Sequence, residues 1–318
     1  MARVPAPAPP RHRREALPWH APKATLDEPD APARVRAVIE DPSYREADRD
    51  LDFLQSADNR GARLQLDYLK AESALQRHGV RDTIVVFGST RIPEPAAAAR
   101  QLAALQRQAA HSPDDAGLQR RLATAHRLVD KSRHYEVARD FGRLAASTPD
   151  PVSGQRLVVM TGGGPGIMEA ANRGAHDAGQ PSIGLNIALP HEQYPNPYVT
   201  PGLCFQFHYF AMRKLHFLLR ARALVAFPGG FGTFDELFET LTLVQTRKIE
   251  PVPIVLVGQA YWRRAFDIDF LIDEGTIDPE DRELFWYAET AQEIWDDIAQ
   301  WYRQSGRSPT GGAGASPD

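Results

Sequence analysis

The sequence predicts an α/β fold: a Rossmann-like, doubly wound parallel sheet flanked by helices, with an N-terminal helical arm before it. From residue 82 onward, short apolar runs alternate with longer stretches of helical period. The short runs are apolar throughout, which is typical of strands in a parallel sheet that is covered on both faces. Turns rich in glycine or small residues follow three of these runs, and such sheets bind ligands at the carboxyl ends of their strands.

Six runs have the length and composition of buried strands. They comprise residues 83–87, 157–160, 182–187, 203–207, 223–227 and 253–257, the last being the final predicted strand. Helices are predicted at residues 96–146 (two or three helices, interrupted near Ser112 and Pro113), 167–178, 210–222, 237–244, 261–273 and 291–303.

Composition and periodicity divide the chain into four segments. Residues 1–33 mix Pro, Ala, Arg and His without periodicity, so we expect them to be disordered. Residues 34–81 carry helical patterns and form the predicted arm, whose leucines we expect to pack on the main domain. Residues 82–304 form the Rossmann-like domain, and residues 305–318, rich in Gly, Ser and Pro, form a flexible tail.

Composition also excludes several classes of protein. The 318-residue chain has a formal net charge of −4, which gives no electrostatic reason to expect a nucleic-acid partner. Cys204 is the only cysteine, so an internal disulfide is excluded and a thiolate metal cluster is disfavoured. No apolar run is long enough to span a bilayer, and the basic N-terminus lacks the apolar core of a signal peptide. We therefore expect a cytoplasmic protein without a membrane partner.

The most informative segment is PGGFGTFDE, residues 228–236. It lies between a predicted strand and a predicted helix. Its three glycines let backbone N–H groups approach an anion closely, and the helix N-terminus adds a favourable dipole. Thr233 supplies a hydroxyl, while Asp235 and Glu236 supply carboxylates that we place in the first helical turn. A turn that only binds phosphate needs no acids beside it, so we expect a phosphorylated substrate whose sugar or reacting centre meets a carboxylate.

A second glycine-rich turn, GGGPGIME, occupies residues 162–169 after a predicted strand. It departs from the G-x-G-x-x-G spacing of dinucleotide-binding proteins, and the acid expected about 20 residues further on is absent, which disfavours a nicotinamide enzyme. We expect this turn, including Gly163 and Gly164, to line a substrate pocket rather than to be only a tight turn. The sequence contains no G-x-x-x-x-G-K-[ST] motif, so a P-loop nucleotidase is excluded.

Two further segments at strand ends are open to either interpretation. Gly88 and Ser89, after the first predicted strand, belong either to an ordinary capped turn or to another wall of the same pocket. The loop at residues 190–195, which contains Glu192 and is stiffened by prolines, either covers a ligand or is an ordinary surface loop.

Arg213 and Lys214 follow an aromatic run that can line a slot of the size of a nucleobase: Phe205, Phe207, Tyr209 and Phe210. Charged residues on helices are usually solvated. A guanidinium at such a place can nevertheless clamp a phosphate or assist a leaving group. The ten histidines are scattered and form no compact ligand set, so no metal site is predicted.

In combination, the GGGxGxME turn, the Arg213–Lys214 pair and the PGGxGTxxE segment resemble the Lonely Guy family. Each motif alone is weakly specific, whereas the combination is specific and covers residues 82–302. Members of this family are cytokinin riboside 5′-monophosphate phosphoribohydrolases, long labelled possible lysine decarboxylases. The resemblance implies hydrolysis of the N-glycosidic bond of a nucleoside 5′-monophosphate, AMP or N6-prenylated AMP, to the free base and ribose 5-phosphate. It also implies a homo-oligomer, a dimer or larger.

The resemblance implies roles for individual residues as well. Arg213 and Glu236 correspond to the catalytic arginine and glutamate of the family. Together with the turns described above, the expected substrate-binding residues are Gly88, Ser89, Gly163, Gly164, Glu192, Lys214, Gly229, Gly230, Phe231, Gly232, Thr233, Phe234, Asp235 and Thr242. No metal and no organic cofactor is implied, and the expected partner is a small-molecule nucleotide.

This chain departs from the family pattern at two places, both of which concern the preferred base. Plant members read Met-His-x-Arg-Lys around the catalytic arginine, whereas this chain lacks the histidine there. Asp235 stands where many relatives have Glu. A non-catalytic nucleotide-binding or regulatory protein on the same fold is the main alternative. A pyridoxal-phosphate decarboxylase is a third, although Lys214 and Lys248 are its only candidate lysines in the second half of the chain.

Overall fold

The computed structural model describes residues 15, 17, 23–150, 154–190 and 194–310. The chain divides into two compact units, Met1–Arg63 and Leu64–Asp318. Most of the segment predicted to be disordered, and residues 311–318 of the predicted tail, lie outside the described residues. Among the described helices, none combines the length and the hydropathy needed to cross a lipid bilayer.

The N-terminal unit is helical, as the periodicity predicts. It contains α1 (Ala31–Glu40), α2 (Leu51–Gln55), the short 3₁₀ helices η1 (Pro42–Tyr44) and η2 (Ala57–Asn59), and the start of α3 (Arg60–Arg77). The Asp50 side chain caps α2 by accepting a hydrogen bond from the Phe53 N–H at 3.1 Å. Apolar side chains of this unit are largely exposed, for example Val38 at 59% and Leu51 at 66%.

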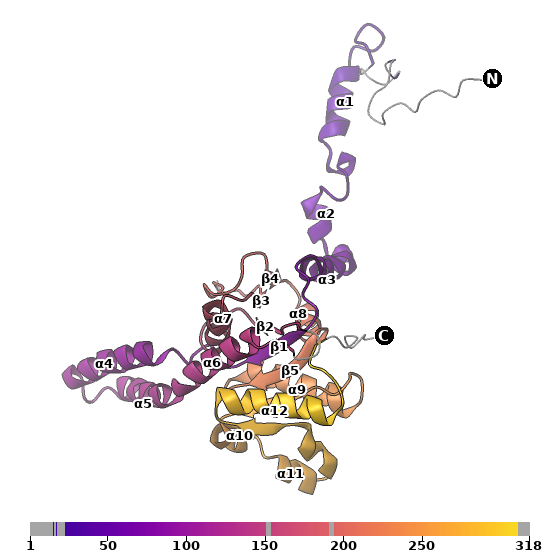
Figure 1. Cartoon of the computed structure of the whole chain (residues 1–318). Helices are drawn as coiled ribbons and strands as arrows, with labels where there is room; N and C mark the ends of the chain where they lie inside the picture. Colours follow the sequence, from indigo (N-terminus) through magenta and orange to yellow (C-terminus); the bar gives the residue numbers. More distant parts are fainter. Residues whose placement is uncertain (1–14, 16, 18–22, 151–153, 191–193, 311–318) are drawn as a thin grey trace. The chain divides into compact units, whose positions relative to one another are not determined.

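The second unit is built on a seven-stranded sheet in which every strand is parallel to its neighbours, so the predicted fold class is confirmed (Figure 1). The strands are β1 (Thr83–Phe87), β2 (Val158–Thr161), β3 (Ser182–Ile187), β4 (Cys204–Phe207), β5 (Ala221–Ala226), β6 (Ile254–Val257) and β7 (Trp286–Ala288). Their order is β4-β3-β2-β1-β5-β6-β7. The chain therefore builds outward from β1 to β4, returns to the centre of the sheet, and builds outward again on the other side.

Helices cover both faces of this sheet. In order along the chain, the helices that follow β1 are α4 (Pro95–His111), α5 (Ala116–Lys131), α6 (Arg133–Ser147), α7 (Ile167–Asp177), α8 (Phe210–Leu218), α9 (Phe231–Gln245), α10 (Gln259–Ala265), α11 (Ile268–Asp273), the 3₁₀ helix η3 (Pro279–Leu284) and α12 (Ala291–Gln304). Of these, α4 and α5 pack on each other and project away from the sheet (Figure 1). The interruption predicted near Ser112 and Pro113 is confirmed, because α4 ends at His111 and α5 begins at Ala116.

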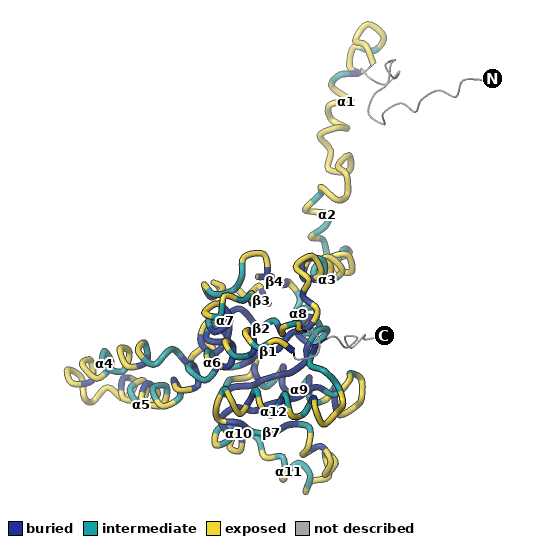
Figure 2. Tube along the Cα trace, viewed as in Figure 1, coloured by how far each residue is buried: buried dark blue, intermediate teal, exposed yellow. Residues whose placement is uncertain are grey.

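The two faces carry separate apolar cores, because successive residues of a strand point to opposite sides. Val85 of β1 belongs to one core, with side chains from α3, α8, α9 and α10: Leu75, Phe217, Leu237 and Trp262. Ile84 and Val86 belong to the other, with side chains from α6, α7 and α12: Phe141, Ile167 and Ile298. Figure 2 shows the buried strands between partly exposed helices. The sheet is therefore buried between two apolar cores.

Three sequence predictions about single elements were wrong. The last strand, Trp286–Ala288, was missed because three residues are too few to show a strand pattern. The helix predicted at 210–222 ends at Leu218, since β5 already begins at Ala221. The helix predicted at 261–273 is two helices, and the Asp267 side chain caps the second by accepting from the N–H groups of Asp269 and Phe270.

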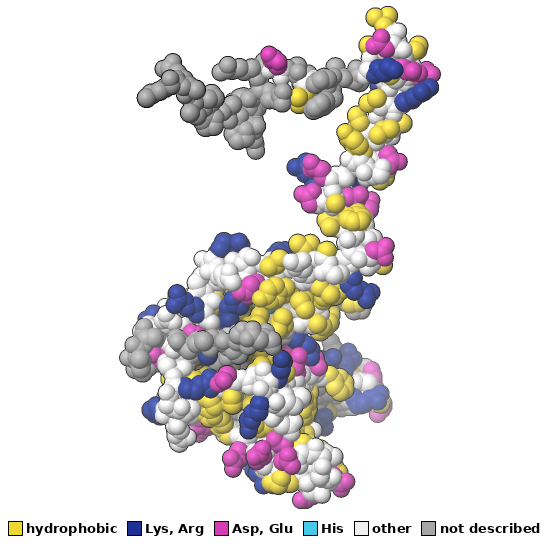
Figure 3. All heavy atoms as spheres, turned by 90° about the vertical axis from the view of Figure 1, so that its right-hand side faces the viewer, with side chains coloured by type: hydrophobic (Ala, Val, Ile, Leu, Met, Phe, Trp, Pro, Cys, Tyr) yellow, Lys and Arg dark blue, Asp and Glu magenta, His cyan; other side chains and the backbone are white. Residues whose placement is uncertain are grey.

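The later part of α3 packs within the sheet unit and fixes the segment that leads into α8. Glu72 accepts two hydrogen bonds from the guanidinium of Arg220, at 2.8 and 2.6 Å. Asp67 accepts hydrogen bonds from the backbone N–H groups of His208 and Tyr209, at 2.9 and 2.8 Å. These hydrogen bonds hold the start of α8, which carries Arg213, against α3. Figure 3 shows hydrophobic side chains gathered on one face of the sheet unit.

Helices α6 and α7 cross with their backbones in contact, so Gly174→Ala should destabilise the protein. A Cβ at Gly174 would lie 2.0 Å from the carbonyl oxygen of Arg139, which belongs to backbone and cannot rotate away. We expect the free energy of unfolding, measured by urea denaturation, to fall by about 1–3 kcal/mol. Gly61→Ala is the matched control, because nothing lies within 4 Å of its Cβ position. An unchanged stability of Gly174→Ala would contradict close helix contact.

Candidate functional site

A cavity of about 560 Å³ opens at the carboxyl ends of the central strands. This volume is within the range of sites that bind small molecules. Among the described residues, the lining comprises Phe87, Gly88, Ser89, Thr90, Arg91, Gly162, Met168, Ile187, Leu189, Phe210, Arg213, Gly230, Phe231, Gly232, Thr233, Asp235 and Glu236. The turns after β1, β2 and β5 thus contribute to one cavity, at the place where the strand order reverses.

The PGGFGTFDE segment forms the tight turn after β5 and the start of α9. Gly230 is the N-cap of the helix and Phe231 its first residue. The helix therefore begins earlier than predicted, and Asp235 and Glu236 lie in its second turn, so their placement in the first turn was wrong. Because the first N–H groups of a helix lack intrahelical acceptors, the end of α9 at Phe231 and Gly232 presents donors and a positive dipole to the cavity.

Arg213 is held in place on the cavity wall by its backbone and ring contacts. Its Nε donates a hydrogen bond to the carbonyl oxygen of Leu185 at 2.7 Å. Its guanidinium carbon lies 5.2 Å from the centroid of the Phe217 ring. A Cβ at Gly162 would lie 2.6 Å from Arg213 Nη2, so the absence of a side chain at Gly162 gives the guanidinium its space. Burial lowers the pKa of Arg213, while Glu236 and Asp235 oppose this effect.

Glu236 is the buried acid of the cavity, with 7% of its surface exposed. Burial raises the pKa of its carboxyl to about 7, although the positive charges of Arg213 and Lys214 lower it in part. The protonated and the ionised carboxyl are therefore both populated near neutral pH. Such a group can accept a proton and can also stabilise a positive charge. Arg213 and Glu236 influence each other electrostatically and line the same cavity.

The structure brings most of the predicted site residues together at this cavity. Nine of them line it: Gly88, Ser89, Arg213, Gly230, Phe231, Gly232, Thr233, Asp235 and Glu236. Lys214 is not among the lining residues. Its Nζ instead forms ion pairs with Asp235 at 2.8 Å and with Glu239 at 3.1 Å, and so joins α8 to α9. Glu192 lies outside the described residues.

Gly163 and Gly164 support the cavity from behind without lining it. The side-chain amide of Asn196 donates to the Gly164 carbonyl oxygen at 3.0 Å, and the Asn196 N–H donates to Gly163 O at 2.8 Å. The Gly163 N–H donates to the Thr161 hydroxyl at 2.9 Å. These three backbone groups of the turn therefore bond to protein partners.

Three other predicted residues also lie away from the lining. Gly229 accepts a hydrogen bond from the hydroxyl of Tyr261. The ring of Phe234 packs 5.3 Å from that of Trp262, in the core on its side of the sheet. Thr242 is exposed, and its hydroxyl donates to the carbonyl oxygen of Phe238 at 2.8 Å.

The lining also contains residues that the sequence did not single out as ligands. Of the aromatic run before Arg213, only Phe210 is among the described lining residues. Ile187 is the last residue of β3 and Leu189 follows it, while Thr90 and Arg91 follow Ser89. Only their position at the ends of predicted strands could have indicated that they line the cavity. Their residue type could not, because apolar side chains at a strand end resemble core residues.

Among the described residues, the structure contains no group of three or more His, Cys, Asp or Glu side chains placed to hold a metal ion. The carboxylates of Asp235 and Glu236 lie near the cations Arg213 and Lys214, and Lys214 also pairs with Glu239. The polar groups on the cavity wall include one buried carboxyl, one half-buried guanidinium and the donors at the start of α9.

Comparison with known proteins supports the relationship that the motifs suggest. A family model described as "Possible lysine decarboxylase" matches residues 168–298. Cytokinin riboside 5′-monophosphate phosphoribohydrolase LOG3 of Arabidopsis thaliana is 30% identical over 174 residues, which are 54% of this chain and 77% of LOG3. The chain belongs to the Lonely Guy family. LOG4 of the same plant, which has the same enzyme name, is 30% identical over 175 residues, 54% of this chain and 77% of LOG4.

One solved structure is also similar to this chain. The X-ray structure of TM1055 is 22% identical, with a TM-score of 0.42, and the match covers 69% of this chain and 99% of that chain.

The raised pKa of Glu236 should make stability depend on pH. The pKa of this carboxyl is higher in the folded state than in the unfolded state. The protein should therefore become less stable as pH rises from 4.5 to about 7, because ionisation of the carboxyl is costlier in the folded state. Glu236→Gln removes this dependence. Between pH 4.5 and 8 the free energy of unfolding of the variant should therefore rise relative to that of the wild type by up to about 3 kcal/mol. Urea denaturation of both proteins at the two pH values measures this difference. Glu274→Gln, at the exposed end of α11, is the control. Parallel pH profiles for wild type and Glu236→Gln would contradict the assignment.

Proposed function

We propose that this protein hydrolyses the N-glycosidic bond of a nucleoside 5′-monophosphate, AMP or N6-prenylated AMP, and releases the base and ribose 5-phosphate. The observation that carries the proposal is that Arg213 and Glu236 line one cavity beside the N-terminus of α9. Membership in a family whose relatives LOG3 and LOG4 bear the name phosphoribohydrolase supports the same reaction.

Glu236 is the proposed catalytic carboxylate. Cleavage of the bond between C1′ and the base nitrogen passes through a sugar with oxocarbenium character, which a nearby carboxylate stabilises. In its ionised form Glu236 accepts a proton from water as the water oxygen bonds to C1′. The base leaves with the electron pair of the broken bond and takes up a proton. A pKa of about 7 suits a base that works near neutral pH.

Arg213 acts through charge in this scheme and not through proton transfer. A guanidinium has too high a pKa to be an effective general acid. Its positive charge can offset the negative charge that develops on the leaving base, or can orient Glu236. The hydrogen bond to Leu185 O and the ring of Phe217 fix its position before substrate arrives. A preorganised charge of this kind needs little rearrangement during the reaction.

The remaining lining suits the other parts of a nucleotide. The first turn of α9, with Gly232 and the Thr233 hydroxyl, offers donors for a phosphate. Apolar side chains of Met168, Ile187 and Phe210 offer a surface for a flat base, with or without an apolar substituent. The phosphate would supply binding energy remote from the bond that breaks, and so would hold the ribose against Glu236.

Removing either charged group should stop turnover while the fold is retained. We expect Glu236→Gln to lower kcat with AMP by about 10²–10⁴-fold, and Arg213→Ala by about 10²–10³-fold. Release of adenine and ribose 5-phosphate measures the rate, and circular dichroism checks the fold. The exposed-site control Glu274→Gln should keep wild-type activity. Stoichiometric AMP binding without any release of adenine by the wild type would favour a non-catalytic nucleotide-binding protein instead.

A second prediction concerns the 5′-phosphate. Charge-assisted hydrogen bonds contribute about 1.5–3 kcal/mol each, so kcat/KM for AMP should exceed that for adenosine by about 100-fold or more. Thr233→Val should lower kcat/KM for AMP and leave that for adenosine unchanged. Thr246→Val makes the same chemical change at an exposed position of the segment after α9 and should have no effect. Equal kcat/KM for AMP and adenosine would rule out the phosphate role of this turn.

A further inference from the structure

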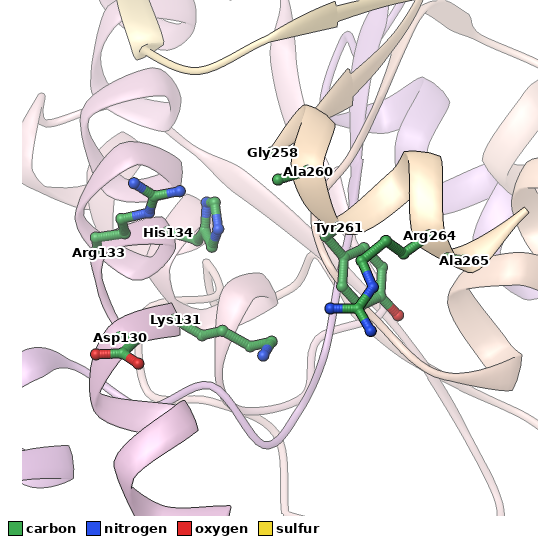
Figure 4. Close-up of a pocket in the computed structure, with 9 residues that line it drawn as sticks. All are labelled: Asp130, Lys131, Arg133, His134, Gly258, Ala260, Tyr261, Arg264 and Ala265. Carbon is green, nitrogen blue, oxygen red and sulfur yellow. The ribbon is translucent and has the colours of Figure 1, made fainter.

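A second cavity, of about 790 Å³, lies where α5 meets α6, opposite the start of α10 (Figure 4). It shares none of its lining residues with the candidate active site. The lining consists of Asp130, Lys131, Arg133, His134, Gly258, Ala260, Tyr261, Arg264 and Ala265. Two walls therefore form it: the junction of two helices on one side, and the segment after β6 on the other.

The charge of this cavity is opposite to that of the whole chain. Three cationic side chains and one carboxylate line it, whereas the chain has a net charge of −4. Figure 4 shows Lys131 and Arg264 entering from opposite walls, with the Asp130 carboxylate away from both cationic groups. Neither Lys131 nor Arg264 forms an ion pair within the part of the chain that the structure describes. Arg133 has only a long contact with Glu289, at 3.8 Å. Cations without partners around one cavity favour an anionic ligand.

His134 provides an independent indication of a ligand. The residue is 4% exposed, and its Nδ1 is buried without a hydrogen-bond partner among the described residues. A buried polar atom without a partner is costly, so in a folded protein it calls for an explanation such as a bound water, ion or ligand. Burial lowers the pKa of His134 to about 4, so the ring is neutral at pH 7 and can donate from one nitrogen. His134 also lies in the first turn of α6, a helix of 15 residues whose N-terminus favours negative charge.

The cavity lies directly behind the glycine turn of the candidate active site. Tyr261, which lines the cavity, donates a hydrogen bond from its hydroxyl to the carbonyl oxygen of Gly229. A Cβ at Gly258 would lie 2.9 Å from the His134 ring and 3.5 Å from Pro228 Cγ. One wall of the cavity therefore contacts the backbone that places Gly230 and the start of α9.

We propose that this second cavity binds a phosphorylated small molecule, with the phosphate between Lys131 and Arg264 and beside the first turn of α6. Occupancy changes the position of the Gly229 turn through Tyr261 and so regulates the catalytic site. The binding step is independent of the proposed function, whereas the regulatory step rests on it.

Binding is tested with inorganic pyrophosphate, which has the charge of the expected ligand but lacks a sugar and a base. Isothermal titration calorimetry of the full chain should detect a binding event that Lys131→Ala/Arg264→Ala weakens at least tenfold. Arg213→Ala should retain that event. Arg121→Ala/Arg303→Ala removes the same charge at exposed positions of α5 and α12 and should have no effect. If Lys131→Ala/Arg264→Ala binds pyrophosphate as the wild type does, the second site is rejected.

Regulation is tested by measuring kcat/KM for AMP with and without pyrophosphate. Pyrophosphate that competes at the active site affects every variant equally, so the informative quantity is the difference between the wild type and Lys131→Ala/Arg264→Ala. Tyr261→Phe removes the hydrogen bond to Gly229 and should abolish that difference while pyrophosphate still binds. Identical responses of the wild type and the double variant would reject the regulatory step. Absence of AMP turnover in all proteins would reject the proposed function and leave the calorimetric result unaffected.

Discussion

Hydrogen bonds between the ends of β1 and β5 are the constraint on which the candidate site depends. The Phe227 N–H donates to Phe87 O at 2.8 Å, and the Ser89 N–H donates to Pro228 O at 3.0 Å. They join two segments that are far apart in the sequence and meet because the strand order reverses at β1. Beyond this junction the segments after β1 and β5 diverge, and the cavity lies between them. A glycine turn alone would not make a site without the facing turn after β1.

A second constraint is the balance between the cost of burying the charged groups of the cavity and the attraction between them. Burial disfavours both the carboxylate of Glu236 and the guanidinium of Arg213, and the attraction between them offsets part of that cost. For Glu236 the effect of burial is the larger, so the pKa of its carboxyl rises to about 7. Lys214 lies one position further along α8 and pairs with Asp235 and Glu239, which leaves Arg213 to face the cavity. Of the two adjacent cations on α8, Lys214 therefore forms ion pairs with α9, whereas Arg213 lines the cavity.

The sequence predicted the fold well because parallel strands are apolar throughout and their periodicity differs from that of the helices. The site was predictable to the extent that chemistry follows strand ends, as for Arg213, Glu236 and Thr233. Gly163 and Gly164 show the limit of this reasoning: their backbone groups bind Asn196, which is distant in the sequence. Phe234 lies one residue from Thr233 but faces the core, because helical rotation separates neighbours by 100°. Pairing over long sequence separations, and the direction of each side chain, required coordinates.

The strand order has a consequence for biosynthesis. Chains grow from the N-terminus, so β1 to β4 are synthesised before residues 221–226 of β5 exist. During this interval the central strand has one bare edge, with unpaired backbone groups and the fully apolar stretch Ile84–Phe87. Such an intermediate is prone to associate with other nascent chains. A chain that terminates between β4 and β5 would therefore form an aggregation-prone partial sheet and not a smaller folded domain.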